Sequence, residues 1–242
     1  MAAFPLIPVL YLQIYVLSSL LIFLAAFAYD FVFDKKLEFM RRQRRSLEAS
    51  EAKGSISSAL AKAILIDIAS SYPLGKCSPA RRASHLLTLW GFIIIVLSIL
   101  VSSTGLAGKF YVSPSNPFMI SQLVGNLSLI VGTLWYLPQR VNVKFEGNST
   151  FSLNYSDAFI INLIAISAFD IAAYLFSALS LAFLSQVTIY AYFLLITLMF
   201  ALTHWTKFPH SFYKAGLFIL DRIDEEKGIS NLPKPVETKA ER

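Results

Sequence analysis

Residues 158–205 read AFIINLIAISAFDIAAYLFSALSLAFLSQVTIYAYFLLITLMFALTHW and contain one charged side chain, Asp170. A transmembrane helix needs about 20 consecutive apolar residues to cross the hydrocarbon core, so this stretch is long enough for two. The serines between Ser180 and Ser185 interrupt the apolar run and predict a tight hairpin between spans 158–181 and 183–205. The stretch therefore indicates helices packed in a membrane.

Three further apolar tracts precede this pair, at residues 8–29, 84–108 and 116–138. The chain of 242 residues is 56% hydrophobic and 15% charged, whereas an ordinary soluble domain is about 45–50% apolar and about 25% charged. We therefore expect an all-α, multi-pass bundle of five transmembrane helices in the cell (cytoplasmic) membrane, with little chain left for a soluble domain.

The distribution of basic residues predicts the orientation. Eleven lie between Lys35 and Arg82, two in the loop 139–156 and seven after the last span, while the other loops hold only Lys109. Because basic loops stay in the cytoplasm, we expect the N-terminus outside and the C-terminus inside. Basic residues placed in this way argue against nucleic-acid binding. The single cysteine, Cys77, excludes an internal disulfide and a cysteine-ligated iron–sulfur cluster.

The chain is expected to divide into a first transmembrane helix, a cytoplasmic basic insertion, a four-helix membrane core and a cytoplasmic tail, at residues 1–34, 35–83, 84–210 and 211–242. The insertion is predicted to be partly helical, with an amphipathic helix around Ala59–Ile68 on or near the membrane surface. Its basic residues suit anionic lipid headgroups or a docked partner. Ser78 and Pro79 give a start signal for the second span, serine as N-cap and proline at the first helical position.

The chain has only three histidines, His85, His204 and His210. His85 lies about two turns into a span that enters from the cytoplasm, and His210 lies where the fifth span returns to it. These helices run antiparallel, so the two histidines are expected at the same depth, in position to clamp a haem. Neutral imidazole is a suitable axial ligand for haem iron. The alternative is that both are interfacial histidines that bond only to headgroups or backbone.

Haem propionates are anionic and need basic partners at the membrane edge. The candidates flank the two histidines: Arg81, Arg82, Lys207 and Lys214. The apolar part of a haem is expected among Trp90, Phe92 and Phe208.

Two other residues are candidates for a functional role. Asp170 lies near the middle of the fourth span, where a carboxylate is costly and is by default a functional hypothesis. It is expected either to relay protons during quinone chemistry or to be a protonated acid bonded to a Ser or Tyr of the next helix. His204 is expected to contact a quinone or to bond to a neighbouring helix. The less favoured alternative is that it ligates the haem in place of His210. Asp157, at the entrance of the fourth span, is expected to be its N-cap.

Several motifs together resemble the nitrate reductase gamma-subunit family of cytochromes b, which includes the membrane subunits of heterodisulfide reductase. The segment Arg81–Phe92, RRASHLLTLWGF, is similar to that family's second span, and Thr206–His210, TKFPH, to the end of its last span. Gly125–Gly132, GNLSLIVG, closing with Arg140, resembles the third span, and Asp157 stands where the fourth begins. Five spans with the N-terminus outside also fit this family.

The resemblance covers roughly residues 80–220 and leaves the insertion unexplained. It implies His85 and His210 as ligands of one haem b on the cytoplasmic side. Members with two haems carry a second histidine pair, and the equivalent positions here are Ile95 and Tyr192. The resemblance therefore implies that the outer-side haem, and with it an outer quinol site, is missing.

These observations predict a haem b membrane subunit of a respiratory oxidoreductase. Such a subunit exchanges electrons between the quinone pool and a separate iron–sulfur protein on the cytoplasmic face, and is not an enzyme by itself. A second hypothesis is a cofactor-free membrane anchor or assembly subunit in which both histidines are incidental. The third, a small-molecule transporter, is disfavoured because intramembrane polar residues are few and paired broken helices are missing from the pattern.

Overall fold

The structure is a computed structural model that describes residues 9–33, 56–104, 117–140, 143, 146–153, 157–201, 215–220 and 222–223. Five helices in these ranges are long and apolar enough to cross a membrane, which confirms the predicted class: α1 (Val9–Phe33), α5 (Pro79–Ser103), α6 (Pro117–Tyr136), α8 (Ala158–Ala178) and α9 (Ala182–Ala201). A helix satisfies its own backbone N–H and C=O groups, as a segment in lipid must.

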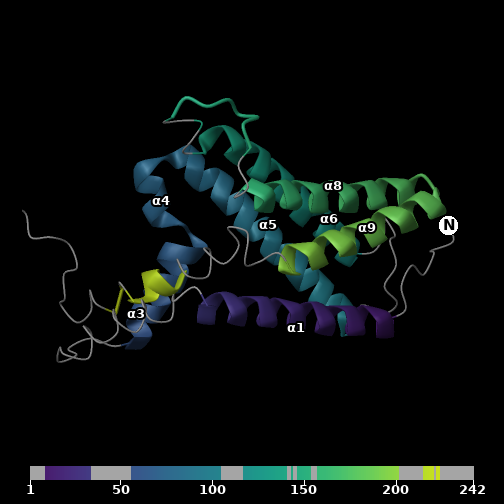
Figure 1. The fold of residues 1–242 in the computed structure, drawn as a ribbon, viewed down its shortest axis with the longest axis horizontal. Coiled ribbons are helices and arrows are strands. Elements are labelled where there is room, and N and C mark those ends of the chain that lie inside the picture. The colour runs from purple at the N-terminus through teal and green to yellow at the C-terminus, as the bar shows by residue number, and fades with distance from the viewer. Residues whose placement is uncertain are drawn as a thin grey trace, which may run out of the picture.

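The helices alternate in direction, so α5 and α8 begin at the end of the bundle where α1, α6 and α9 finish (Figure 1). Helix α6 packs between α5 and α8, α9 packs on α8, and α1 contacts both α9 and α5. Their inward side chains form one apolar core that includes Leu12, Ile95, Leu129, Leu163 and Ile189.

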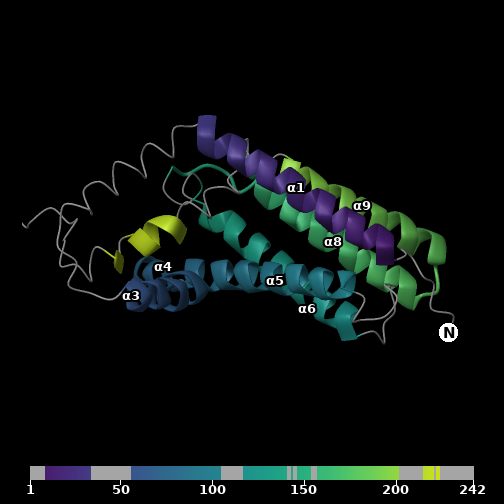
Figure 2. The ribbon, with the colours of Figure 1, turned by 90° about the horizontal axis from the view of Figure 1, so that it is seen from below.

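Helix α1 approaches α5 at one end only. Gln13 Nε2 donates to the carbonyl oxygen of Ser103 at 2.9 Å, which joins the first turns of α1 to the last turn of α5. From there the two helices diverge toward the end where α5 begins (Figures 1 and 2). The described helices are therefore splayed at the end that carries His85.

The predicted start signal of the second span is confirmed. Ser78 has extended backbone angles, and its Oγ accepts from the backbone N–H of Arg81 at 3.3 Å, with Pro79 at the first helical position. The helix begins at Pro79 and ends at Ser103, so it lies about one turn earlier than the span expected at 84–108. The polar first turn continues the helix, because capping rather than hydropathy decides where it begins.

Small residues allow α5 and α6 to approach closely. A Cβ added at Gly91 would lie 2.7 Å from the carbonyl oxygen of Gly125, and one added at Gly132 would lie 2.6 Å from Thr88 Oγ1. There is no room for a methyl group at either contact.

The predicted tight hairpin between the last two spans is confirmed. Helix α8 ends at Ala178 and α9 begins at Ala182, with Ser180 in a left-handed conformation at φ 60°. Ser185 Oγ then donates to the carbonyl oxygen of Ala173 at 3.0 Å, which joins the two helices near their connection.

The described part of the insertion is helical, in agreement with the expectation for Ala59–Ile68. It consists of α3 (Ile56–Lys62), a π-helical segment η1 (Ala63–Ala69) and α4 (Tyr72–Cys77). These elements lie at the end of the bundle where α5 begins (Figure 1). Asp67 of η1 forms a bidentate ion pair with Arg222, at 2.7 and 2.9 Å, which connects the insertion to the described part of the C-terminal region.

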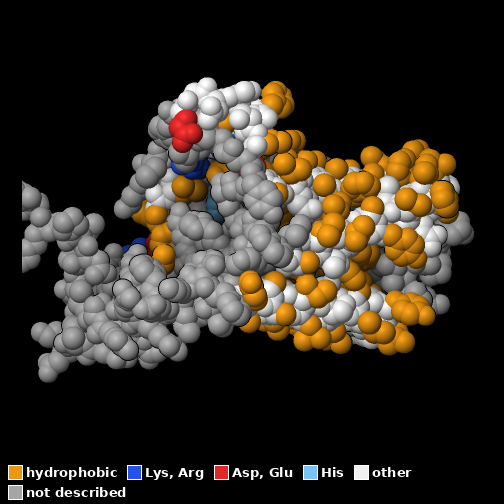
Figure 3. Space-filling model, viewed as in Figure 1, with side chains coloured by type: hydrophobic (Ala, Val, Ile, Leu, Met, Phe, Trp, Pro, Cys, Tyr) orange, Lys and Arg blue, Asp and Glu red, His pale blue; other side chains and the backbone are white. Residues whose placement is uncertain are grey.

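Hydrophobic side chains cover the face of the bundle seen in Figure 3, and the charged side chains visible there lie toward the end that carries α4. Large apolar residues with half or more of their surface exposed include Leu17, Leu97, Val131 and Leu194. Such a belt suits lipid, which is as apolar as these side chains.

Candidate functional site

His85 projects from the second turn of α5 and is exposed. Its Nδ1 lies 2.9 Å from Ser71 Oγ, and Ser71 Oγ donates its hydrogen to the carbonyl oxygen of Ile68 at 3.2 Å. When the Ser71 hydroxyl hydrogen is used on Ile68, Nδ1–H of His85 donates to Ser71 Oγ. That tautomer carries its lone pair on Nε2, the nitrogen that a metal would need.

The face of α5 that carries His85 is turned toward the core of the bundle. Residues seven apart lie on nearly the same face of a helix, and both Phe92 and Ile99, one and two heptads after His85, pack against the hydrophobic core. His85 continues this stripe but is exposed. Helices α5 and α1 diverge toward the end where α5 begins (Figure 2).

The other predicted residues of this region hold α5 against its neighbours. Arg81 Nη2 donates to the carbonyl oxygen of Gln139 at 2.6 Å, and Arg82 Nε donates to that of Ser70 at 2.9 Å. Trp90 Nε1 donates to the carbonyl oxygen of Ala69 at 3.1 Å and remains 46% exposed. These bonds leave other guanidinium N–H groups of each arginine for an anionic ligand.

The rest of the predicted haem site lies outside the described residues. This holds for His204, Lys207, Phe208, His210 and Lys214. In the part of the chain that the structure describes, no three His, Cys, Asp or Glu side chains come together as a metal site. A haem held by two histidines would need no such group, and His85, restrained by Ser71, would be able to supply one of them.

Asp170 lies in a second polar site, buried in the middle of the bundle. Its Oδ1 accepts from Gln122 Nε2 at 2.9 Å and its Oδ2 from Asn126 Nδ2 at 2.7 Å. Gln122 Nε2 also donates to Tyr192 Oη at 3.1 Å. All four side chains are at most 1% exposed. We call Asp170, Gln122, Asn126 and Tyr192 the central polar cluster.

One of the two alternatives expected for Asp170 was a bond to a Ser or Tyr of the next helix. Its hydrogen-bond partners are instead two amides of α6, and the hydroxyl of Tyr192 on α9 is joined to the cluster through Gln122. Tyr192 stands where two-haem members of the family that the motifs resemble would carry a histidine, and Ile95, the other such position, is 3% exposed in the apolar core. Core side chains thus occupy both positions.

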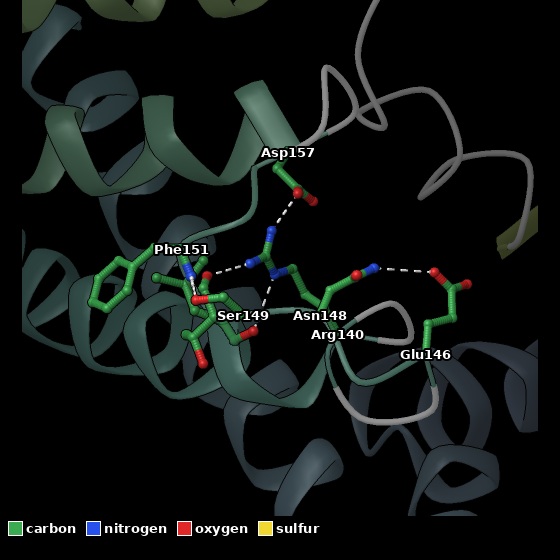
Figure 4. Close-up of polar contacts among 8 residues, drawn as sticks. Arg140, Glu146, Asn148, Ser149, Phe151 and Asp157 are labelled. Carbon is green, nitrogen blue, oxygen red and sulfur yellow. Dashed lines mark hydrogen bonds and ion pairs between the residues drawn. The ribbon is translucent and has the colours of Figure 1, made fainter.

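Asp157 does not act as a side-chain cap. It occupies the N-cap position of α8 but makes no capping bond, because its carboxylate pairs with the guanidinium of Arg140 (Figure 4). Both side chains are 3% exposed. Arg140 also donates to the carbonyl oxygens of Leu137 and Thr150, so it fastens the loop between α6 and α8 to the end of the bundle.

Sequence reasoning did not identify Ser71, Gln122 or Asn126. Gln122 and Asn126 are one turn apart in the third span, and the need of a buried Asp170 for donors was the signal that could have found them. Ser71 gave no such signal, because it reaches His85 only through its own left-handed backbone, at φ 48°.

A scan against protein-family models found no matching family, and searches of the curated proteins and of the solved structures likewise found no match.

Proposed function

We propose that this chain is a haem b-carrying membrane subunit of a respiratory oxidoreductase that exchanges electrons between a quinone and an iron–sulfur protein on the cytoplasmic face. The observation that carries the proposal is the placement of His85. Its imidazole lies on the core-facing stripe of a membrane helix, exposed where the helices splay, with Ser71 fixing its ring.

The second ligand would be His210. It follows α9 in the sequence, and α9 ends at the same end of the bundle at which α5 begins (Figure 1). We therefore expect His210 to lie near the level of His85. A haem held there would supply one-electron transfer.

The residues around His85 have complementary roles in this proposal. Ser71 would accept from Nδ1–H of His85 and restrain the ring, which would leave Nε2 as the ligating nitrogen. Arg81 and Arg82 place positive charge at the membrane edge, where propionates would lie, while their bonds to Gln139 and Ser70 hold α5 in place. The insertion then acts as the element that positions a ligand, besides offering a basic surface to a partner.

The test is a dithionite-reduced minus oxidised optical spectrum of the full chain purified in detergent, with a pyridine haemochrome assay for haem per polypeptide. We expect one b-type haem per chain. The variants His85→Ala and His210→Ala are expected to lose it, whereas His204→Ala, which removes the remaining histidine, is expected to keep it.

Folding of each variant is checked by size-exclusion chromatography and far-UV circular dichroism. Wild-type protein that is folded, expressed with haem available and colourless would contradict the proposal and favour the cofactor-free anchor. Retention of haem in both His85→Ala and His210→Ala would reject these residues as the ligand pair.

A further inference from the structure

The central polar cluster has an unusual balance of donors and acceptors. Asn126 Nδ2 donates twice, to Asp170 Oδ2 at 2.7 Å and to the carbonyl oxygen of Gln122 at 2.9 Å. Asn126 Oδ1, on the same amide, is buried and has no hydrogen-bond partner. An unpaired buried acceptor costs about 1–3 kcal/mol, so the cluster is short of one donor.

The cluster is also short of one positive charge. Asp170 is 1% exposed in the middle of α8, and a carboxylate at that depth is expected to have a charged partner or to be neutral. Of the helices that pack on α8, α6 contributes two neutral amides and α9 contributes Tyr192, the one other titratable side chain with a bond to this cluster among the described residues. No Lys, Arg or His of the described part bonds to it.

A single proton on Asp170 removes the need for a positive charge, because a protonated acid is neutral. Gln122 Nε2 and Asn126 Nδ2 keep their bonds to the two oxygens, since a carboxylic acid still accepts hydrogen bonds. Asn126 Oδ1 stays the unpaired acceptor of the cluster.

We propose that the central polar cluster is an intramembrane proton-binding site, in which Asp170 holds a proton in the resting protein while Gln122 and Asn126 of α6 donate to its two oxygens. Proton binding is thereby linked to α6 as well as α8. The proposal does not depend on His85 or on a haem.

The test is infrared spectroscopy of the full chain in lipid, because a carboxylic acid has a C=O stretching band that a carboxylate lacks. At neutral pH we expect one such band that disappears in Asp170→Asn. The matched control is Asp67→Asn, which removes another buried aspartate. Asp67 is paired with Arg222 and is expected to be a carboxylate, so the band should persist.

A second variant tests the partner and keeps Asp170 in place. In Asn126→Leu the band is expected to persist at higher frequency, because the acid group has lost a hydrogen bond. If Asp170→Asn removes no carboxylic acid band from the wild-type spectrum, Asp170 is charged and the proposal is overturned. A band whose frequency is the same in Asn126→Leu would overturn the role of Asn126. Measured in His85→Ala protein, the same bands are expected, so failure of the haem proposal leaves this one standing.

Discussion

At the scale of single residues, one unusual backbone conformation brings His85 to Ser71. The two side chains are separated by 14 positions in the chain, and the left-handed turn at Ser71 ends η1 and turns the chain back toward α5. The sequence identifies His85, because a histidine near the end of an apolar span is conspicuous. It does not identify Ser71, because a serine among polar neighbours has many possible roles.

Ser71→Ala tests whether this contact tunes a ligand. Donation from Nδ1–H increases electron density on Nε2 and favours oxidised iron, so the variant is expected to keep its haem with a higher midpoint potential, measured by redox titration. Ser70→Ala is the matched control, since Ser70 Oγ donates to the carbonyl oxygen of Ile66 instead. An unchanged midpoint potential in Ser71→Ala, or an equal shift in both variants, would show that Ser71 does not tune the haem ligand.

The buried pair of Arg140 and Asp157 gives a second prediction at this scale. Removing one partner leaves an uncompensated buried charge, so Arg140→Ala is expected to lower the free energy of unfolding by about 3–5 kcal/mol. The double variant Arg140→Met, Asp157→Leu replaces the pair with apolar side chains and is expected to recover most of that loss. Thermal unfolding in detergent measures both, and an Arg140→Ala protein as stable as wild type would contradict the expectation.

At the scale of elements, hydropathy and turn signals predict most of what the structure describes. The five spans, the cap at Ser78 and the hairpin at Ser180 follow from local rules, because each depends on residues close together in sequence. The π-helical form of η1 and the ion pair between Asp67 and Arg222 do not, because neither follows from residues close together in sequence.

The contact between α5 and α6 predicts opposite outcomes for two glycines. A Cβ at Gly91 would meet the backbone of Gly125 at 2.7 Å, whereas a Cβ at Gly75 would meet Arg82 Cδ at the same 2.7 Å. Backbone cannot move aside, but a flexible side chain can. Gly91→Ala is therefore expected to cost about 1–3 kcal/mol and Gly75→Ala clearly less. Equal losses in thermal unfolding would show that α5 and α6 are not held this closely.

At the scale of the whole molecule, the basic insertion and the loop between α6 and α8 lie at the same end of the bundle (Figure 1). The charge rule predicts that this end faces the cytoplasm. Sequence charge gives this orientation, but it cannot give the splay between α1 and α5, which depends on side-chain packing.

Cysteine labelling tests the orientation in a Cys77→Ser background. Asn148→Cys, in the exposed loop between α6 and α8, is expected to resist a membrane-impermeant thiol reagent in intact cells and to react in inside-out vesicles. Ser115→Cys, between the second and third spans, is expected to behave in the opposite way. The reverse labelling pattern would show that the bundle has the opposite orientation and that the proposed haem lies on the outer side.

The order of the helices along the chain bears on how the protein is made. Gln122 and Asn126, the donors to Asp170, belong to α6, and α6 leaves the ribosome before α8 does. The helix with a costly carboxylate therefore enters the bilayer after the helix that stabilises it. Helix α8 is then able to partition as one member of a pair, and membrane insertion of this span is assisted by a neighbour synthesised in advance.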